Sequence, residues 1–173
     1  MQEHATATAD MLQHAIGASQ RIMLNLRPPI LDQGLVAAVQ WLASSFERRT
    51  GVTTVVRTSS GAVDIPAEIQ LVAYRTAQEA LTNVAKYAAP QSVHIELADS
   101  EGVLTLEVAD DGCGIEPAMR EKPKAFGLKG LQERARTVNG WLDISSHPGK
   151  GTSVILSVPL ASRHNAPDEG ASQ

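Results

Sequence analysis

The sequence predicts an α/β fold, a two-layer sandwich in which a mixed sheet carries helices on one face. Strand-like segments come mostly as hairpins, over 92–110 and 141–160, and helical segments separate them. Hydrophobic residues make up 43% of the 173 residues and aromatic residues only 3%, so the core is expected to be aliphatic. A chain of this length is expected to form one domain, with room for an appended helix.

The first segment, 1–27, is predicted to be one amphipathic helix, because its apolar residues recur at steps of three and four. Pro28 and Pro29 end this helix, since proline disfavours helical geometry in the residue before it. We expect its apolar stripe to need a partner. The predicted domains are this helix with a linker over 1–34, a compact domain over 35–160 and a disordered tail over 161–173.

The compact domain is predicted element by element. A helix over 35–49 ends at Gly51, a β-branched strand follows over 52–60, and a long helix covers 66–88. Alternating apolar residues then predict two strands joined by a turn at Asp99–Gly102. A loop over 111–127, rich in glycine, proline and charge, leads into a helix over 128–139. The last hairpin turns through Pro148–Gly151.

Composition excludes several functional classes. The net charge of −4, the pI of about 5.7 and the scarcity of aromatic residues argue against a nucleic-acid surface. The single cysteine, Cys113, excludes an intrachain disulfide framework and a multi-cysteine zinc site. No apolar run approaches the ~20 residues of a membrane span, and no signal peptide is visible. We therefore expect a cytoplasmic piece without membrane contact, whose parent protein could still be membrane-anchored.

The long helix carries a first set of candidate residues. Counted from Glu79, three further polar residues follow at positions four, seven and eight: Asn83, Lys86 and Tyr87. A continuous α-helix places all four on one side. An amide oxygen suits Mg²⁺, an ammonium suits phosphate, and a carboxylate can polarise a nucleophile. The same spacing also fits a solvated helix face, and taken alone it favours that simpler interpretation.

Three glycine motifs follow. In the first, Asp110-Asp111-Gly112-Cys113-Gly114, a strand runs into a carboxylate that can accept a hydrogen bond from an exocyclic amine, and glycines let backbone approach a ligand closely. The second, 126–131, opens a helix whose free amides can bind an anion. The third, 148–152, ends on Thr152 and lacks the spacing of a Walker loop. Each also fits an ordinary turn or loop.

The order of these motifs is more specific than any one of them. The motif order resembles the ATP-binding domain of the superfamily of gyrase, the heat-shock chaperone, histidine kinases and MutL. The motifs, in order, are NxxKY on a helix, DDGCG after a strand, GLKGL and GKGT. The resemblance spans about residues 35–160 and implies the Bergerat-type ATP-binding fold. Within that superfamily, LRPPILDQGL and QEALTNVAKYA resemble two-component sensor histidine kinases of the nitrate-sensor subfamily, which carry LRP at the end of their second dimerisation helix.

The resemblance implies roles for the residues on the long helix. Asn83 is expected to bind Mg²⁺, and Lys86 and Tyr87 to contact the ATP phosphates. Subfamily members often have histidine at the position of Tyr87, a mild departure. Glu79 stands where the gyrase branch keeps a catalytic glutamate, and we take it as the catalytic residue, although its role toward an imidazole nucleophile is less defined.

The glycine motifs receive roles in the same way. Asp110 is expected to hydrogen-bond the adenine amino group, Gly112 and Gly114 to line the base pocket, and Gly151 and Thr152 to close its far wall. Three further residues are expected to form a lid over the phosphates: Gly127, Leu128 and Gly130.

The family transfers the γ-phosphate of ATP to a histidine on the first dimerisation helix, and from there to a response regulator. None of the five histidines here stands in the sequence context expected of that acceptor histidine. His4 and His14 do lie on a predicted amphipathic helix, which is the general kind of helix that carries the acceptor. We therefore expect a piece of a larger, homodimeric kinase, with the acceptor histidine elsewhere. Its partners are expected to be the dimerisation helices and a response regulator, with no nucleic acid.

Three alternatives remain at this point. One is a serine kinase of the anti-sigma type, which lacks the LRP helix end. Another is a hydrolase of the gyrase or MutL branch, favoured by Glu79 but disfavoured by the short lid and the lack of a transducer domain. The third is a bare nucleotide-binding module, which a phosphate-transfer assay with an added acceptor helix would distinguish from a kinase.

Overall fold

The computed structural model describes residues 27–59, 65–115 and 127–160. The predicted helix over 1–27, most of the loop predicted over 111–127 and the predicted tail over 161–173 lie outside these residues. The elements in chain order are η1 (Pro29–Gln33), α2 (Leu35–Thr50), β1 (Thr53–Thr58), α3 (Ala67–Asn83), η2 (Val84–Ala88), β2 (Ser92–Ser100), β3 (Val103–Asp110), α5 (Leu128–Thr137), β4 (Trp141–Ser146) and β5 (Thr152–Pro159).

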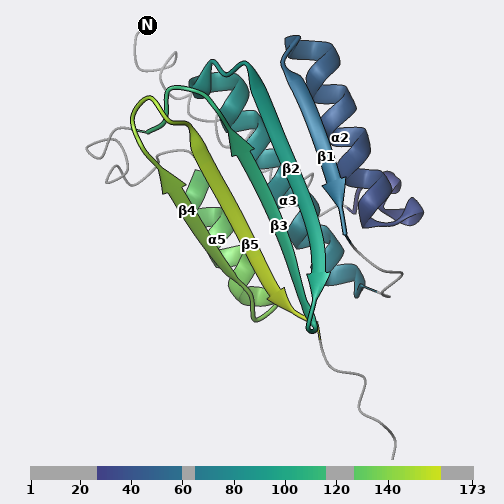
Figure 1. The fold of residues 1–173 in the computed structure, drawn as a ribbon. Coiled ribbons are helices and arrows are strands. Elements are labelled where there is room, and N and C mark those ends of the chain that lie inside the picture. The colour runs from purple at the N-terminus through teal and green to yellow at the C-terminus, as the bar shows by residue number, and fades with distance from the viewer. Residues whose placement is uncertain (1–26, 60–64, 116–126, 161–173) are drawn as a thin grey trace, which may run out of the picture.

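The strands of the described residues form one five-stranded sheet in the order β1-β2-β3-β5-β4. β1 runs parallel to β2, and every other neighbouring pair is antiparallel, so the sheet is mixed as predicted. Figure 1 shows α2, α3 and α5 on the same side of this sheet. The predicted fold class, a two-layer α/β sandwich with helices on one face, is confirmed for the described residues.

The core lies between the two layers and is aliphatic. Strand residues alternate, so that Ile95 and Leu97 of β2 and Leu106 of β3 are almost fully buried against the helices. Phe46 of α2 is fully buried too, on the apolar face that the sequence periodicity predicts. α2 ends as predicted at Gly51, whose φ of 73° is left-handed and whose amide donates to the Glu47 carbonyl. This packing fixes the ends of the strands, where the predicted site residues lie.

Two segments differ from the predictions. The helix predicted over 66–88 is α-helical only to Asn83 and continues as a π-helical turn, η2, from Val84 to Ala88. The segment predicted as linker contains the short 3-10 helix η1, and its Leu31 is 1% exposed and belongs to the core. Periodicity shows neither feature, because a single wide turn and a five-residue helix are too short to produce a repeating pattern.

The β2–β3 hairpin is tighter than predicted, since only Glu101 and Gly102 lie outside the strands. Both have positive φ, as the favoured two-residue hairpin turns require.

None of the helices within 27–59, 65–115 and 127–160 combines the length and the apolar character needed to cross a bilayer.

Candidate functional site

The predicted site residues gather at one end of the sheet, the upper end in Figure 1, where β3 and β4 end and β5 begins. Asp110 is the last residue of β3 and pairs with Thr152, the first residue of β5. η2 meets the same place, because the Cys113 amide donates to the Ala88 carbonyl at 2.8 Å. Segments that are far apart in sequence therefore meet around the end of β3.

Asp110 lies at the centre of this arrangement, and its carboxylate is half-buried. Its Oδ1 atom accepts the Gly112 amide at 2.8 Å, and the Thr152 amide also donates to the carboxylate. Burial raises the pKa of Asp110 above its ordinary value, while the two amide donors lower it and the neighbouring charge of Asp111 raises it. The site thus holds a partly desolvated carboxylate that has hydrogen-bonding capacity beyond the two protein amides.

Three of the predicted glycines are required by contacts between backbone segments. A Cβ atom on Gly112 would lie 2.3 Å from the Ala88 carbonyl oxygen, and one on Gly114 would lie 2.1 Å from that of His147. A Cβ atom on Gly151 would lie 1.8 Å from the Asp110 carbonyl oxygen. The loop after β3 is therefore packed directly between η2 and the β4–β5 turn. These glycines build the wall of the site by close backbone packing.

A second polar group, Ser146, ties these segments together. Ser146 is the last residue of β4 and is 7% exposed. Its Oγ atom accepts the Ile115 amide at 2.8 Å, lies 3.1 Å from the Gly151 carbonyl oxygen and lies 2.8 Å from the Thr152 Oγ1 atom. One hydroxyl group thus links the loop after β3 to the turn before β5.

The structure places the residues of the long helix along its end. Asn83 is the last residue of α3 and is partly buried, whereas Lys86 and Tyr87 lie in the π-helical turn with exposed side chains. The turn is wider than an α-helical one, so the premise that all four residues follow a continuous 3.6-residue period is wrong beyond Asn83. The Tyr87 and Ala88 carbonyls of this turn accept the Sγ–H and the amide of Cys113.

Glu79 contacts the start of α5. A Cβ atom on Gly127 would lie 2.4 Å from the Glu79 Oε1 atom, and Gly127 has a left-handed φ of 62°. Leu128 begins α5, and Gly130, with open space around its Cα, lies in the first turn. Of the loop predicted over 111–127, which leads into these residues, the structure describes 111–115 and Gly127. The structure therefore brings Glu79 and Gly127 together and places Gly130 on the surface.

Asp111, the exposed neighbour of Asp110, has a structural role. Its carboxylate accepts the amides of Gln91 and Ser92 at 2.8 and 3.0 Å and the Ser92 hydroxyl at 2.8 Å. The hydrogen bonds from Ser92 hold the pKa of Asp111 below its ordinary value. Asp111 thus attaches the end of β3 to the start of β2.

This interaction predicts a pH effect on stability. Because the pKa of Asp111 is lower in the folded than in the unfolded chain, the ionised carboxylate stabilises the fold above the unfolded pKa of about 3.9. The contribution is lost as pH falls through the lowered folded value. We expect Asp111→Asn to unfold at lower urea than wild type at pH 7 and the gap to shrink at pH 3. An equal gap at both pH values would contradict this role.

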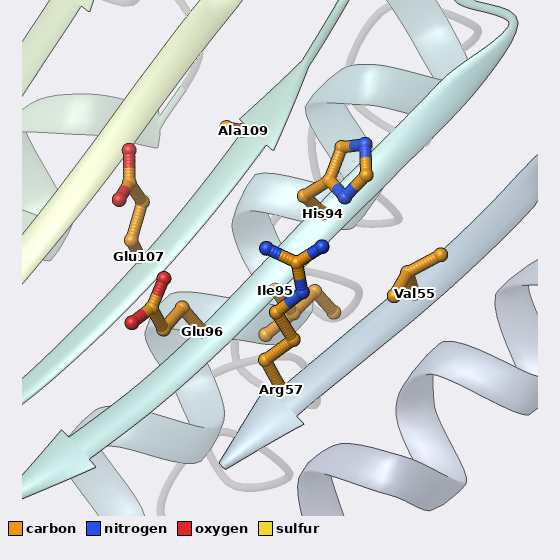
Figure 2. Close-up of a pocket in the computed structure, with 7 residues that line it drawn as sticks. All are labelled: Val55, Arg57, His94, Ile95, Glu96, Glu107 and Ala109. Atoms are coloured by element: carbon orange, nitrogen blue, oxygen red, sulfur yellow. The ribbon is translucent and has the colours of Figure 1, made fainter. Parts of the chain in front are cut away.

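The opposite face of the sheet carries a hollow of about 270 Å³, lined by Val55, Arg57, His94, Ile95, Glu96, Glu107 and Ala109. Figure 2 shows the Arg57 guanidinium beside His94, and the carboxylates of Glu96 and Glu107 on neighbouring strands. None of the predicted site residues lines this hollow. The candidate site is therefore at the strand ends and the helix layer, and the hollow is a separate surface feature.

Ser146 was not among the residues predicted from the sequence to lie at the site. The signal was its position: the inward-facing residues of β4 are Leu142, Ile144 and Ser146, so the alternation reaches a polar residue directly before the turn. An inward polar residue at a strand end needs hydrogen-bond partners, and the glycine motifs on either side supply them. The carbonyl groups of Ala88 and His147 pack against Gly112 and Gly114, and no sequence pattern predicts these backbone contacts.

Comparison with known proteins identifies a family and several relatives. Residues 68–162 match the family described as histidine kinase-, DNA gyrase B- and HSP90-like ATPases. The chain is 36% identical over 151 residues to the oxygen sensor histidine kinase NreB of Staphylococcus carnosus, covering 87% of this chain and 44% of that protein. It is 29% identical to the signal transduction histidine-protein kinase/phosphatase DegS of Brevibacillus brevis, covering 87% and 39%.

A solved structure shows the same fold. The blue-light activated histidine kinase of Erythrobacter litoralis EL346 superposes with a TM-score of 0.58 at 24% identity, over 72% of this chain and 41% of that one. The chain spans less than half the length of each of these relatives. From the family match, and from the motifs that meet around Asp110, the chain belongs to the histidine kinase-, DNA gyrase B- and HSP90-like ATPases.

Proposed function

We propose that this chain is the ATP-binding catalytic domain of a sensor histidine kinase, a protein-histidine kinase that transfers the γ-phosphate of ATP to a histidine on a dimerisation helix. The observation that carries the proposal is the convergence of η2, the loop after β3 and the β4–β5 turn around the half-buried carboxylate of Asp110. Such a carboxylate, with strand-end backbone packed tightly around it, suits a ligand that offers an amine.

In the base pocket, Asp110 accepts a hydrogen bond from the adenine amino group. Gly112 and Gly114 keep the wall of the pocket thin, because no side chain separates this loop from η2 and from the hairpin turn. Gly151 and Thr152 close the far side, where the Thr152 amide donates to the same carboxylate. The hydrogen bonds to Asp110 hold the acceptor in place before the base arrives, so little reorganisation is needed on binding.

The end of α3 and η2 serve the phosphates. Lys86 and Tyr87 extend from η2 with exposed side chains that can reach phosphate oxygens. Gly127, Leu128 and Gly130 provide the start of α5, whose free amides suit an anion. The carboxylate of Glu79, against the backbone of Gly127, is placed to orient the acceptor imidazole where α5 begins.

The donor chemistry fits Mg²⁺ bound together with the nucleotide. Within the described ranges, no three His, Cys, Asp or Glu side chains lie close enough to hold a metal ion on their own. Magnesium in nucleotide sites usually takes only one or two protein ligands and fills its remaining positions with phosphates and water. The amide oxygen of Asn83 is the protein ligand we propose, and the ion would neutralise phosphate charge during transfer.

The rest of the protein is part of the same proposal. Residues 1–34 contribute a second dimerisation helix and linker, 35–160 the catalytic domain, and 161–173 a tail. The acceptor histidine lies on a helix outside these 173 residues, in a homodimeric kinase that passes the phosphoryl group to a response regulator. We place the domain in the cytoplasm, where ATP is available.

Phosphotransfer with labelled ATP tests this function. We expect no stable label on this chain alone and label on a separately supplied dimerisation domain carrying an acceptor histidine, as an acid-labile and alkali-stable adduct. Asn83→Ala should lose both the magnesium dependence of nucleotide binding and the transfer. Nucleotide binding without transfer to the acceptor would instead leave a bare nucleotide-binding module. Label mapped to His4 or His14 would show that the acceptor is in this chain.

A further inference from the structure

Ser146 offers one hydroxyl proton and two lone pairs to three neighbours, and this count fixes the direction of each hydrogen bond. The Ile115 amide can only donate, so it uses one lone pair of Ser146 Oγ. The Gly151 carbonyl can only accept, so the Ser146 proton points to it at 3.1 Å. The Thr152 hydroxyl, at 2.8 Å, must then donate to the second lone pair of Ser146.

The reverse assignment is less favourable. If Ser146 donated to Thr152, the Ser146 and Gly151 oxygens would stand 3.1 Å apart with no proton between them. Ser146 is 7% exposed, so water does not screen that repulsion well. All three contacts are satisfied together only when the Thr152 hydroxyl donates to Ser146.

This direction determines what the site presents to a ligand. Ser146, Thr152 and Asp110 form one row across β4, β5 and β3, because Thr152 pairs with both of the others. Residues paired across strands project their side chains to the same face, here the face that carries the helices. Because the Thr152 hydroxyl proton is donated to Ser146, the Thr152 oxygen can only accept hydrogen bonds from a ligand. The ionised carboxylate of Asp110 is likewise only an acceptor.

We infer that Ser146 is a positioning residue for base selection: it commits the Thr152 proton, so that the base edge of the site presents acceptors alone and favours a purine with an amino group at position 6 over one with an oxo group there. The inference rests on the proposed nucleotide-binding function. An oxo group would face the acceptors of Thr152 and Asp110 without a proton to share. Ser146 acts through Thr152 and need not touch the base itself.

The test compares ATP with inosine triphosphate, which differs by an oxo group at position 6, in calorimetric titrations of the whole chain. Wild type should prefer ATP. In Ser146→Ala the Thr152 hydroxyl is free to rotate and to donate to the oxo group, so the preference should fall about fivefold, the effect of one net hydrogen bond. Ser145→Ala is the matched control, since Ser145 is exposed on the other face of β4 and should leave both affinities unchanged.

A double-mutant cycle shows whether Ser146 acts through Thr152. Thr152→Val removes the hydroxyl and should lower the preference, and Ser146→Ala should then change the preference no further. Thr152→Ser keeps the hydroxyl and should keep the preference. If Ser146→Ala does not fold, Ser146→Cys takes its place, because a thiol is a weak acceptor of nearly the same shape.

The outcomes separate the two proposals. No ATP binding by wild type would overturn the proposed function itself. Equal affinity of wild type for ATP and inosine triphosphate would overturn the inference and leave the function standing. A Ser146→Ala variant that loses affinity for both nucleotides equally, with an unchanged preference, would mean that Ser146 only supports the loop. A further loss of preference in the Thr152→Val background would exclude the route through Thr152.

Discussion

Gly151→Ala is expected to lower the free energy of unfolding by about 3 kcal/mol or more. The left-handed φ of 79° at this position alone costs an alanine about 1–2 kcal/mol. The added Cβ atom would also lie 1.8 Å from the Asp110 carbonyl oxygen, so β3 and β5 would have to separate where they pair. Urea unfolding followed by circular dichroism measures the loss.

Gly149→Ala is the matched control for this substitution. Gly149 lies in the same turn with a similar left-handed φ of 73°, but nothing lies within 4 Å of a Cβ atom there. We expect it to lose only the conformational part, about 1–2 kcal/mol. Equal losses in the two variants would show that the conformation of the turn, and not the contact with Asp110, makes Gly151 necessary.

Asp110→Asn is expected to weaken ATP and ADP binding by about tenfold or more, and by similar factors, since both carry the same base. A hydrogen bond to a charged acceptor contributes about 1.5–3 kcal/mol, and the amide removes the charge while keeping the shape. The amide keeps one acceptor oxygen, so its NH₂ end faces either a protein amide or the adenine amino group, and neither of these can accept a hydrogen bond well. Calorimetric titration of the folded variant gives the affinities.

Asp111→Asn controls for charge in the same motif. Asp111 makes its hydrogen bonds to Gln91 and Ser92, so this variant should lose some stability and keep its nucleotide affinity. Wild-type affinity in Asp110→Asn, or an equal loss in both variants, would remove Asp110 from the base pocket and leave the family's adenine recognition in this chain unexplained.

Local sequence patterns predicted most of the fold. The period-two alternation of 92–110 and 141–160 gave strands whose inward residues, Ile95 and Leu106 among them, are buried. Gly51 marked the end of α2 because it alone tolerates the left-handed cap without strain. These features depend on residues a few positions apart, so a single sequence carries them.

The sequence indicated which residues to examine at the site, but only part of their geometry. The order of the motifs pointed to Asp110, Gly112, Gly114, Gly151 and Thr152, and the structure places these five residues close together. The sequence suggested that Gly112 and Gly114 make room for a ligand, whereas the structure shows that each makes room for a carbonyl of another segment. Ala88 and Gly112 are 24 positions apart and meet only because α3 packs on the sheet.

By itself, the sequence determined the helices and strands, the aliphatic core and the family, because periodicity, turn glycines and motif order are local or linear properties. The tertiary structure alone decided the π-helical turn after Asn83, whose last carbonyls are satisfied by Cys113, and the hydrogen-bond directions around Ser146. Both features depend on which donors and acceptors of distant segments come within hydrogen-bonding distance, about 3 Å, of one another. Strand register determines which of these groups become neighbours, and no pattern along the chain shows the register.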